Sequence, residues 1–275
     1  MWDILKAIIL GIIEGLTEWL PVSSTGHMIL ADEFIHMDIT PAFKEMFLVV
    51  IQLGAILSIV VLFWNKLWPF SFKKGQPHVK KDTFQLWFKV LVASIPALIV
   101  GLPFNDQIDA LFYNYITVSI TLILYGVLFI WMENRNRRYQ PRVRNLGQLT
   151  YKHAFIMGCF QVLALIPGTS RSGATILGAV LVVGCARPVA AEFSFFMAIP
   201  AMAGASLLKL VKFGFSFTGM EVAILVVGSL VAFVVSMLSV GFLMNYVKKH
   251  DFKVFGWYRI ALGAVVLAYF LLFAK

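Results

Sequence analysis

Two glutamates in an apolar part of the chain have a spacing suited to binding a cation. Glu14 and Glu18 lie four residues apart in "EGLTEWLPVSSTGH", so a helix would place both carboxylates on one face. Two like charges side by side in an apolar region are costly, and a divalent cation between them offsets the repulsion. Mg²⁺ is often held by one or two carboxylates together with substrate phosphates. We therefore expect Glu14 and Glu18 to bind Mg²⁺ or Ca²⁺. The alternative is that one glutamate is protonated or only satisfies loop backbone.

Two short loops rich in glycine and hydroxyl residues have the composition of phosphate-binding sites. In "PVSSTGH" the candidate residues are Ser23, Ser24, Thr25, Gly26 and His27. In "PGTSRSG" they are Gly168, Thr169, Ser170, Arg171, Ser172 and Gly173. Each loop precedes an apolar helix, whose free N–H groups and dipole would attract an anion. Serine and threonine also cap helices for structural reasons alone, which is the alternative.

Arg171 and His27 are the loop side chains best suited to act on a phosphate. A guanidinium within an apolar hairpin needs an anionic partner, and its fork fits phosphate bidentately. A structural pair with a glutamate is the alternative. His27 could serve as general acid, base or nucleophile, or only as a hydrogen-bonding residue.

The elements that must position these residues are membrane helices. The chain has 275 residues, 60% hydrophobic and 13% charged, with a mean hydropathy of +0.85, whereas soluble domains average about 25% charged. Six segments are long enough to cross a bilayer, at about 43–64, 86–104, 113–132, 190–211, 221–244 and 255–273. Two other apolar stretches, 4–30 and 153–183, break in the middle at proline and a polar cluster, which predicts re-entrant hairpins. The fold class is therefore an all-α integral membrane protein with six transmembrane helices and two re-entrant helical hairpins.

The loop charges predict the orientation. The loops 65–85, 133–152 and 245–254 are rich in lysine and arginine, so the positive-inside rule makes them cytoplasmic. The first hairpin then enters from the outer face and the second from the cytoplasmic face. The net charge of +9 reports this topology rather than a nucleic-acid partner.

The two hairpins align with each other at a shift of 147 positions. "GIIEGLTEWLPVSSTGHMIL" lies over "GCFQVLALIPGTSRSGATIL", with six of twenty positions identical, and the same shift matches Glu45 to Glu192. We interpret the chain as one membrane domain, 1–275, in which repeat one (about 1–132) and repeat two (about 153–275) are inverted and joined by a basic linker (about 133–152). Inverted repeats with broken helices are typical of transporters, so a lipid flippase is the rival hypothesis. Glu45 and Glu192 are expected to bond hairpin backbone rather than to catalyse.

The hairpins differ in their chemistry. Glu14, Glu18 and His27 correspond to Gln161, Leu165 and Ala174, whereas Ser24 corresponds to Arg171. Acids and a histidine from one half thus face an arginine from the other. This division suits phosphoryl transfer, in which a cation and an arginine stabilise charge while an oriented hydroxyl or water attacks.

At these residues the sequence resembles the undecaprenyl-diphosphatase family, the bacitracin-resistance type of bacterial membrane phosphatase. The resemblance covers essentially the whole chain and rests on "EGLTEWLPVSSTGH", "PGTSRSGATI", "VIQLGAIL" and "EFSFFMAIP". It implies removal of the terminal phosphate of undecaprenyl diphosphate with a divalent cation, which recycles the carrier lipid for wall polymers. It also implies a multi-pass protein of the bacterial cytoplasmic membrane, an active site facing outside, and bacitracin resistance on overproduction.

The resemblance also implies roles for individual residues. The glutamate-rich motif falls on Glu14 and Glu18, the Ser/Thr/His motif on Ser23, Ser24, Thr25 and His27, and the Pro-Gly-Ser-Arg motif on Gly168, Ser170, Arg171 and Ser172. We expect Glu18, Ser24, His27 and Arg171 to be catalytic. Ser24 is the favoured nucleophile, with His27 and a metal-bound water as rivals. The expected partners are the lipid substrate and membrane lipid, and a homodimer is one open alternative.

Overall fold

Helices make up most of the part of the protein that the structure describes. The computed structural model describes residues 2–71, 78–137 and 140–273. The α-helices are α1 (Trp2–Thr17), α2 (Ser24–Phe34), α3 (Pro41–Leu62), α4 (Trp64–Leu67), α5 (Lys81–Phe112), α6 (Tyr115–Asn136), α7 (Tyr151–Val162), α8 (Arg171–Gly178), α9 (Arg187–Phe213), α10 (Gly219–Lys249) and α11 (Lys253–Leu272). Two 3₁₀ turns, η1 (Leu146–Gln148) and η2 (Leu163–Leu165), and a π-helical turn, η3 (Ala179–Val183), complete them. Among these residues, β structure is limited to two isolated bridges, Phe70 with Val79 and Val143 with Cys185.

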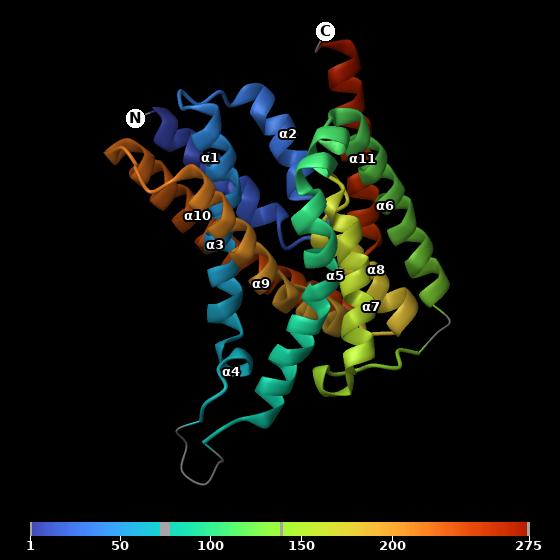
Figure 1. Cartoon of the computed structure of the whole chain (residues 1–275). Helices are drawn as coiled ribbons and strands as arrows, with labels where there is room; N and C mark the ends of the chain where they lie inside the picture. Colours follow the sequence, from blue (N-terminus) through green and yellow to red (C-terminus); the bar gives the residue numbers. More distant parts are fainter. Residues whose placement is uncertain (1, 72–77, 138–139, 274–275) are drawn as a thin grey trace.

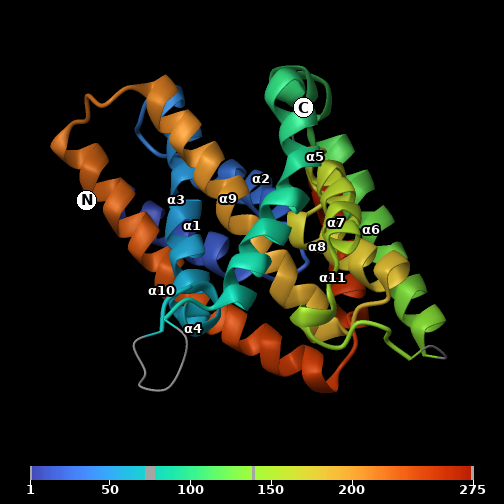
Figure 2. The same ribbon diagram turned by 60° about the horizontal axis from the view of Figure 1, so that its bottom comes forward.

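Within the described residues, six helices are long and apolar enough to cross a membrane: α3, α5, α6, α9, α10 and α11. This confirms the number of spans expected from the sequence. The helix α5 extends further than expected, because its 32 residues continue through Pro96 and Pro103 to Phe112. Figure 1 shows the six helices running between the end that holds both termini and the end that holds α4 and the linker before α7. Figure 2, turned from that view, brings the second end forward.

Four of the shorter helices, α1, α2, α7 and α8, form two broken pairs. The first helix ends at Thr17 and α2 begins at Ser24, while α7 ends at Val162 and α8 begins at Arg171. In Figure 1, α1 descends from the end that holds the termini and α2 returns toward that end, whereas α7 rises from the opposite end. We call the two connections loop A (residues 18–23) and loop B (residues 163–170). They meet in the interior, where they build the site described below.

Glycines allow each hairpin to lie directly on one spanning helix. A Cβ on Gly11 would meet the carbonyl oxygen of Gly228 at 2.6 Å, so α1 lies against the backbone of α10. A Cβ on Gly158 would meet the carbonyl oxygen of Ala93 at 2.2 Å, so α7 lies in the same way against α5. Any larger residue at either position would force the helices apart. Gly11 and Gly158 are themselves 147 positions apart, as in the sequence alignment of the hairpins.

Two ion pairs involve the spanning helices that follow the hairpins. Glu192 of α9 accepts a hydrogen bond of 2.5 Å from Lys66 of the short helix α4, and Glu45 of α3 pairs with Lys209 near the end of α9. The expectation that these glutamates bond hairpin backbone was therefore wrong. Their partners are lysines more than 100 residues away, which no local pattern could indicate.

Candidate active site

Loops A and B share an unusual backbone geometry. Ser23 has φ 74° and Ser170 has φ 68°, and they are the only non-glycine residues with positive φ in the described part of the chain. Each serine is the N-cap of the helix that follows, and its hydroxyl accepts a hydrogen bond from a glycine N–H: Gly26 at 3.4 Å and Gly173 at 3.2 Å. Left-handed non-glycine residues are strained and cluster at functional sites. The sequence match therefore extends to backbone conformation.

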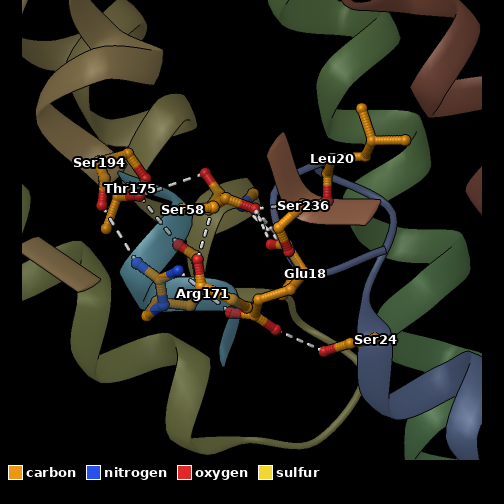
Figure 3. Close-up of polar contacts among 12 residues, drawn as sticks. Glu18, Leu20, Ser24, Ser58, Arg171, Thr175, Ser194 and Ser236 are labelled. Atoms are coloured by element: carbon orange, nitrogen blue, oxygen red, sulfur yellow. Dashed lines mark hydrogen bonds and ion pairs between the residues drawn. The ribbon is translucent and has the colours of Figure 1, made fainter. Parts of the chain in front are cut away.

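Glu18 joins loop A to the start of α8. Arg171 Nη2 donates to Glu18 Oε1 over 3.1 Å, and Ser24 Oγ donates to Glu18 Oε2 over 2.7 Å (Figure 3). Arg171 also donates to the carbonyl of Ser194 over 3.1 Å, and its guanidinium lies 5.5 Å from the Trp19 ring centre. The side chains of Glu18 and Arg171 are only 9% and 13% exposed. Glu18, Ser24 and Arg171, expected to be catalytic, thus form one hydrogen-bonded group.

One hydroxyl group of α8 also reaches loop A. Ser172 Oγ lies 3.4 Å from the carbonyl oxygen of Leu20 and 3.5 Å from that of Glu18. It also lies 3.2 Å from Ser170 Oγ. Ser172 is fully buried, so it supports the junction of the loops from within.

Arg259, which the sequence analysis missed, holds both loops from the side of α11. Its guanidinium donates to Pro21 O of loop A over 3.2 Å, and to Gly168 O and Thr169 O of loop B over 2.8 and 2.9 Å. It is fully buried and lies 5.4 Å from the Tyr125 ring centre. Among the described residues, no carboxylate pairs with it. The available signal was a lone arginine inside a predicted span, since intramembrane charges are rare and functional by default.

Glu14 has the environment expected of an unsatisfied metal ligand. Its carboxylate is 1% exposed, and Oε1 has no hydrogen-bond partner among the described residues. Glu18 and Arg171 are near enough to act on it electrostatically. No group of three or more His, Cys, Asp or Glu residues gathers anywhere in the described ranges, so a cation here would rely on two carboxylates and other oxygens. That set fits Mg²⁺, which commonly completes its coordination with water and substrate phosphate.

Buried polar atoms without a partner occur on both hairpins and on Arg259. In the described part of the chain they belong to Glu14, Trp19, Gln161, Thr169, Arg171 and Arg259. All of these residues lie on the two hairpins except Arg259, which bonds both loops. Buried polar atoms are nearly always satisfied by protein, water or ligand. Their concentration on these elements therefore indicates a site for a polar ligand or ion.

His27 is held at both ring nitrogens. Nδ1 lies 2.7 Å from the carbonyl oxygen of Ser23, and Nε2 lies 2.6 Å from the hydroxyl of Tyr258. A carbonyl only accepts, so Nδ1 carries a proton, and in the neutral ring Nε2 accepts from Tyr258. The His27 and Tyr258 rings also stack, with centres 5.6 Å apart. His27 thus lies beside the loops but, among the described residues, is not hydrogen-bonded to Glu18, Ser24 or Arg171.

The remaining candidate residues shape the loops. Gly168 has φ 86°, and a Cβ on it would lie 2.1 Å from Thr121 Oγ1, so only glycine fits. Thr121 in turn donates to Pro167 O over 2.8 Å, which fixes loop B to α6. Gly26 packs on Leu122, and Thr25 lies half-buried in the first turn of α2.

Comparison with known proteins identifies the family. The family model described as "Bacitracin resistance protein BacA" matches residues 7–265. The chain belongs to this family. It is 63% identical over 271 residues to a protein of Acetivibrio thermocellus named undecaprenyl-diphosphatase, covering 98% of this chain and 99% of that protein. It is 61% identical to undecaprenyl-diphosphatase 1 of Clostridium acetobutylicum (98% of each chain) and 60% identical to an undecaprenyl-diphosphatase of Enterococcus faecalis (96% of each chain).

The BacA family match includes both loops and Arg259. The resemblance inferred from the sequence motifs is thereby confirmed. At the centre of the protein, a glutamate from one hairpin is bonded to a serine of its own hairpin and an arginine of the other. In such a group the carboxylate can accept a proton, the hydroxyl can attack phosphorus, and the guanidinium can bind an anion.

Proposed function

We propose that the protein hydrolyses undecaprenyl diphosphate to undecaprenyl phosphate and inorganic phosphate. The observation that carries the proposal is the bonding of Glu18 to both Ser24 and Arg171, in a chain about 60% identical to proteins named undecaprenyl-diphosphatase. Those names do not favour the flippase hypothesis, which rests on the internal repeat and the matched pair Glu45 and Glu192.

Arg171 is the phosphate-binding side chain in this proposal. Its guanidinium is fixed by Glu18 and the Ser194 carbonyl, so its planar fork is presented in one orientation. A diphosphate entering the junction would share the guanidinium with Glu18. Arginine matches phosphate geometry bidentately, and a cation stabilises charge on the transferring phosphoryl group. The unsatisfied Nε of Arg171 provides a further donor.

Ser24 is the attacking group and Glu18 its base. The Ser24 hydroxyl already donates to Glu18 Oε2 over 2.7 Å, so its proton has an acceptor in place. Ser24 Oγ bonds to the terminal phosphorus as the bond from phosphorus to the bridging oxygen breaks, and undecaprenyl phosphate departs with that oxygen. Water then attacks the phosphoserine, phosphate is released, and the proton returns to Ser24. His27 is less suited as nucleophile, because both of its nitrogens are engaged.

Glu14 and Glu18 would hold the divalent cation, Mg²⁺ or Ca²⁺. When bound, it would neutralise negative charge on the diphosphate. The unsatisfied Glu14 oxygen supports this assignment. We expect a chelator to abolish phosphate release and added Mg²⁺ or Ca²⁺ to restore it. Unchanged release in excess chelator would contradict the assignment.

Mutation of the junction tests the proposal. We expect Glu18→Gln and Arg171→Ala each to lower phosphate release from undecaprenyl diphosphate by roughly 100-fold or more, because each removes a group that stabilises or activates the reacting atoms. The matched controls Glu45→Gln and Arg144→Ala remove the same charges away from the junction and should retain turnover. Ser24→Ala should also be inactive, and quenched parent enzyme should carry phosphate on Ser24. Normal turnover by all three junction variants would refute the proposed function.

The proposed membrane arrangement is a pair of re-entrant hairpins in an inverted repeat, with the site open to the outer face of the bacterial cytoplasmic membrane. Matched serines, glycines and helix contacts in the two hairpins support it. Basic residues concentrated in the linker and the α10–α11 turn support a cytoplasmic position for that end. Cysteines introduced singly at Glu33 and Arg144 should react with an impermeant maleimide from the outside and inside respectively. A homodimer stays a prediction, which the mass in detergent would check.

A further inference from the structure

A basic cavity of about 320 Å³ lies at the opposite end of α8 from the junction of the loops. It is formed where α6 and α10 end and where η3 leads into α9, at the end of the molecule that Figure 2 brings forward. None of its lining residues belongs to the candidate active site. Its volume is at the lower end of the range for small-molecule sites, about 300–1,000 Å³.

The lining of the basic cavity has one sign of charge. Arg135 of α6, Arg142 of the linker, Arg187 of α9 and Lys248 of α10 all line it, and no aspartate or glutamate does. These four cations come from four separate segments of the chain. A concave surface lined by one sign of charge concentrates counter-ions.

One of the four cations is neutralised by a buried carboxylate. Arg187 binds Glu133 through Nε and Nη2, at 2.9 and 2.5 Å, and Glu133 is fully buried. The same carboxylate accepts the N–H of Phe252 over 3.1 Å. Arg187 is therefore a fixed part of the wall. In the described ranges, no carboxylate lies within ion-pair distance of Arg135, Arg142 or Lys248, so the cavity keeps an excess of positive charge.

The backbone holds Arg142 in place at the cavity. Its N–H donates to Gly184 O over 2.9 Å, and Ala186 N–H donates to Val143 O over 2.8 Å, so the linker lies along the segment after η3. The side chain of Arg142 passes over Gly184, where a Cβ would lie 3.6 Å from it. Gly184 has φ 78° and directly follows the π-helical turn. Such turns are rare and occur frequently at functional sites.

The positive-inside rule explains basic residues at this end of the chain but not their convergence. Arg144 and Lys249 are as exposed and as close in sequence as Arg142 and Lys248, yet they do not line the cavity. Either pair of basic residues would satisfy the positive-inside rule equally well. The exposed Val182 and the neighbouring Val180 and Val247 add an apolar part to the lining.

We propose that the basic cavity binds a phosphate group, carried by an anionic membrane lipid or by a soluble phosphate. Arginine and lysine without a carboxylate partner are the side chains that bind phosphate, and Arg142 is positioned by backbone contacts before any ligand arrives. The apolar part of the lining can contact the first acyl carbons of a lipid. Clusters of basic residues between helices at the cytoplasmic side are known to bind lipid headgroups.

Paired variants test the proposal at constant net charge. The lining variant is Arg142→Gln with Lys248→Gln, and the matched control is Arg144→Gln with Lys249→Gln. Full-length protein in neutral detergent would be titrated with cardiolipin, with phosphatidylcholine and with inorganic phosphate, and bound ligand counted by native mass spectrometry. Phosphate release and thermal unfolding would be measured alongside, and both should match the parent, since neither pair belongs to the junction.

The parent and the control should bind cardiolipin or phosphate saturably, and the lining variant roughly 100-fold more weakly, from two lost charge-assisted hydrogen bonds. Selective binding of cardiolipin would establish a lipid headgroup as the ligand. Competition by inorganic phosphate would establish a soluble phosphate as the ligand. If both variants bound the ligand equally weakly, the effect would come from surface charge alone and the proposal would be overturned. So would the absence of any preference of the parent for cardiolipin or phosphate over phosphatidylcholine. If the lining variant unfolds early, Lys248→Gln and Lys249→Gln alone provide the same comparison.

Discussion

Replacing Arg259 by methionine should uncouple the two loops while leaving the protein folded. The change removes three hydrogen bonds, to Pro21 O, Gly168 O and Thr169 O, and keeps most of the side-chain volume. Each buried carbonyl left without a donor costs about 1–3 kcal/mol, so the three together cost about 3–9 kcal/mol at most. Against this, a buried guanidinium without a carboxylate partner carries a desolvation penalty of several kcal/mol, which methionine removes. The two contributions are of similar size, so the stability of the fold should change little.

The activity should change much more than the stability. Arg259 bonds three backbone carbonyls spread over both loops, so its loss lets the Glu18–Ser24 side shift relative to Arg171. A misplacement of about 1 Å in an active site can lower the rate roughly 100-fold. We therefore expect Arg259→Met to lower kcat by about 100-fold with a smaller change in KM. Arg259→Lys, which keeps a charge and can reach some of the carbonyls, should recover part of that loss.

The assay is phosphate release from undecaprenyl diphosphate, with thermal unfolding measured in the same detergent. Ser206→Ala serves as the control, because it removes a buried hydrogen bond of 3.1 Å to Val49 O, between α9 and α3 and away from the loops. It should lower stability by about 1 kcal/mol and leave kcat unchanged. If Arg259→Met keeps kcat within about threefold of the parent, or if its loss of activity simply follows its unfolding, the positioning role is refuted.

Two further substitutions test residues that support the loops. Gly168→Ala should destabilise the protein by about 2–5 kcal/mol, from a left-handed backbone and an overlap with a threonine hydroxyl, whereas Gly204→Ala, with open space around it, should be neutral in thermal unfolding. Tyr258→Phe removes the hydroxyl 2.6 Å from His27 Nε2 and should lower kcat by roughly fivefold at unchanged stability, as loss of about 1 kcal/mol implies. Unchanged kcat would show that the orientation of His27 does not matter to the reaction.

The spans and the two loops could be predicted from the sequence because local signals define both. Long apolar runs fix the six helices, and proline beside a hydroxyl cluster fixes where α1–α2 and α7–α8 break. The gapless match between the hairpins also predicted that Ser23 and Ser170 occupy equivalent positions. It did not predict that both adopt positive φ. The pairing of Glu18 with Arg171 was considered from composition, since a buried arginine needs an anion.

Features that depend on distant partners could not be predicted. Arg259 bonds residues 90 and more positions away, and its contacts are to backbone carbonyls, which carry no side-chain signature. Glu45 and Glu192 were assigned to the hairpins because they follow them, but each pairs with a lysine from the other half of the chain. Charge complementarity across a fold becomes visible only once the helices are packed.

The way the two hairpins agree and differ follows from what each position does. Positions that hold the frame are identical: Ser23 and Ser170 cap helices with the same strained backbone, and Gly11 and Gly158 lie against spanning helices in the same way.

Positions that point to the junction of the loops are different, as Glu18 opposite Leu165 and Ser24 opposite Arg171 show. Two identical hairpins meeting tip to tip would bring together either four carboxylates or two guanidinium groups, and like charges in a buried site repel strongly. A site for phosphoryl transfer needs an anionic base and a cationic clamp within one hydrogen-bonding distance of each other. The two hairpins supply both because they differ at the positions that meet, where Glu18 and Arg171 make a contact of 3.1 Å.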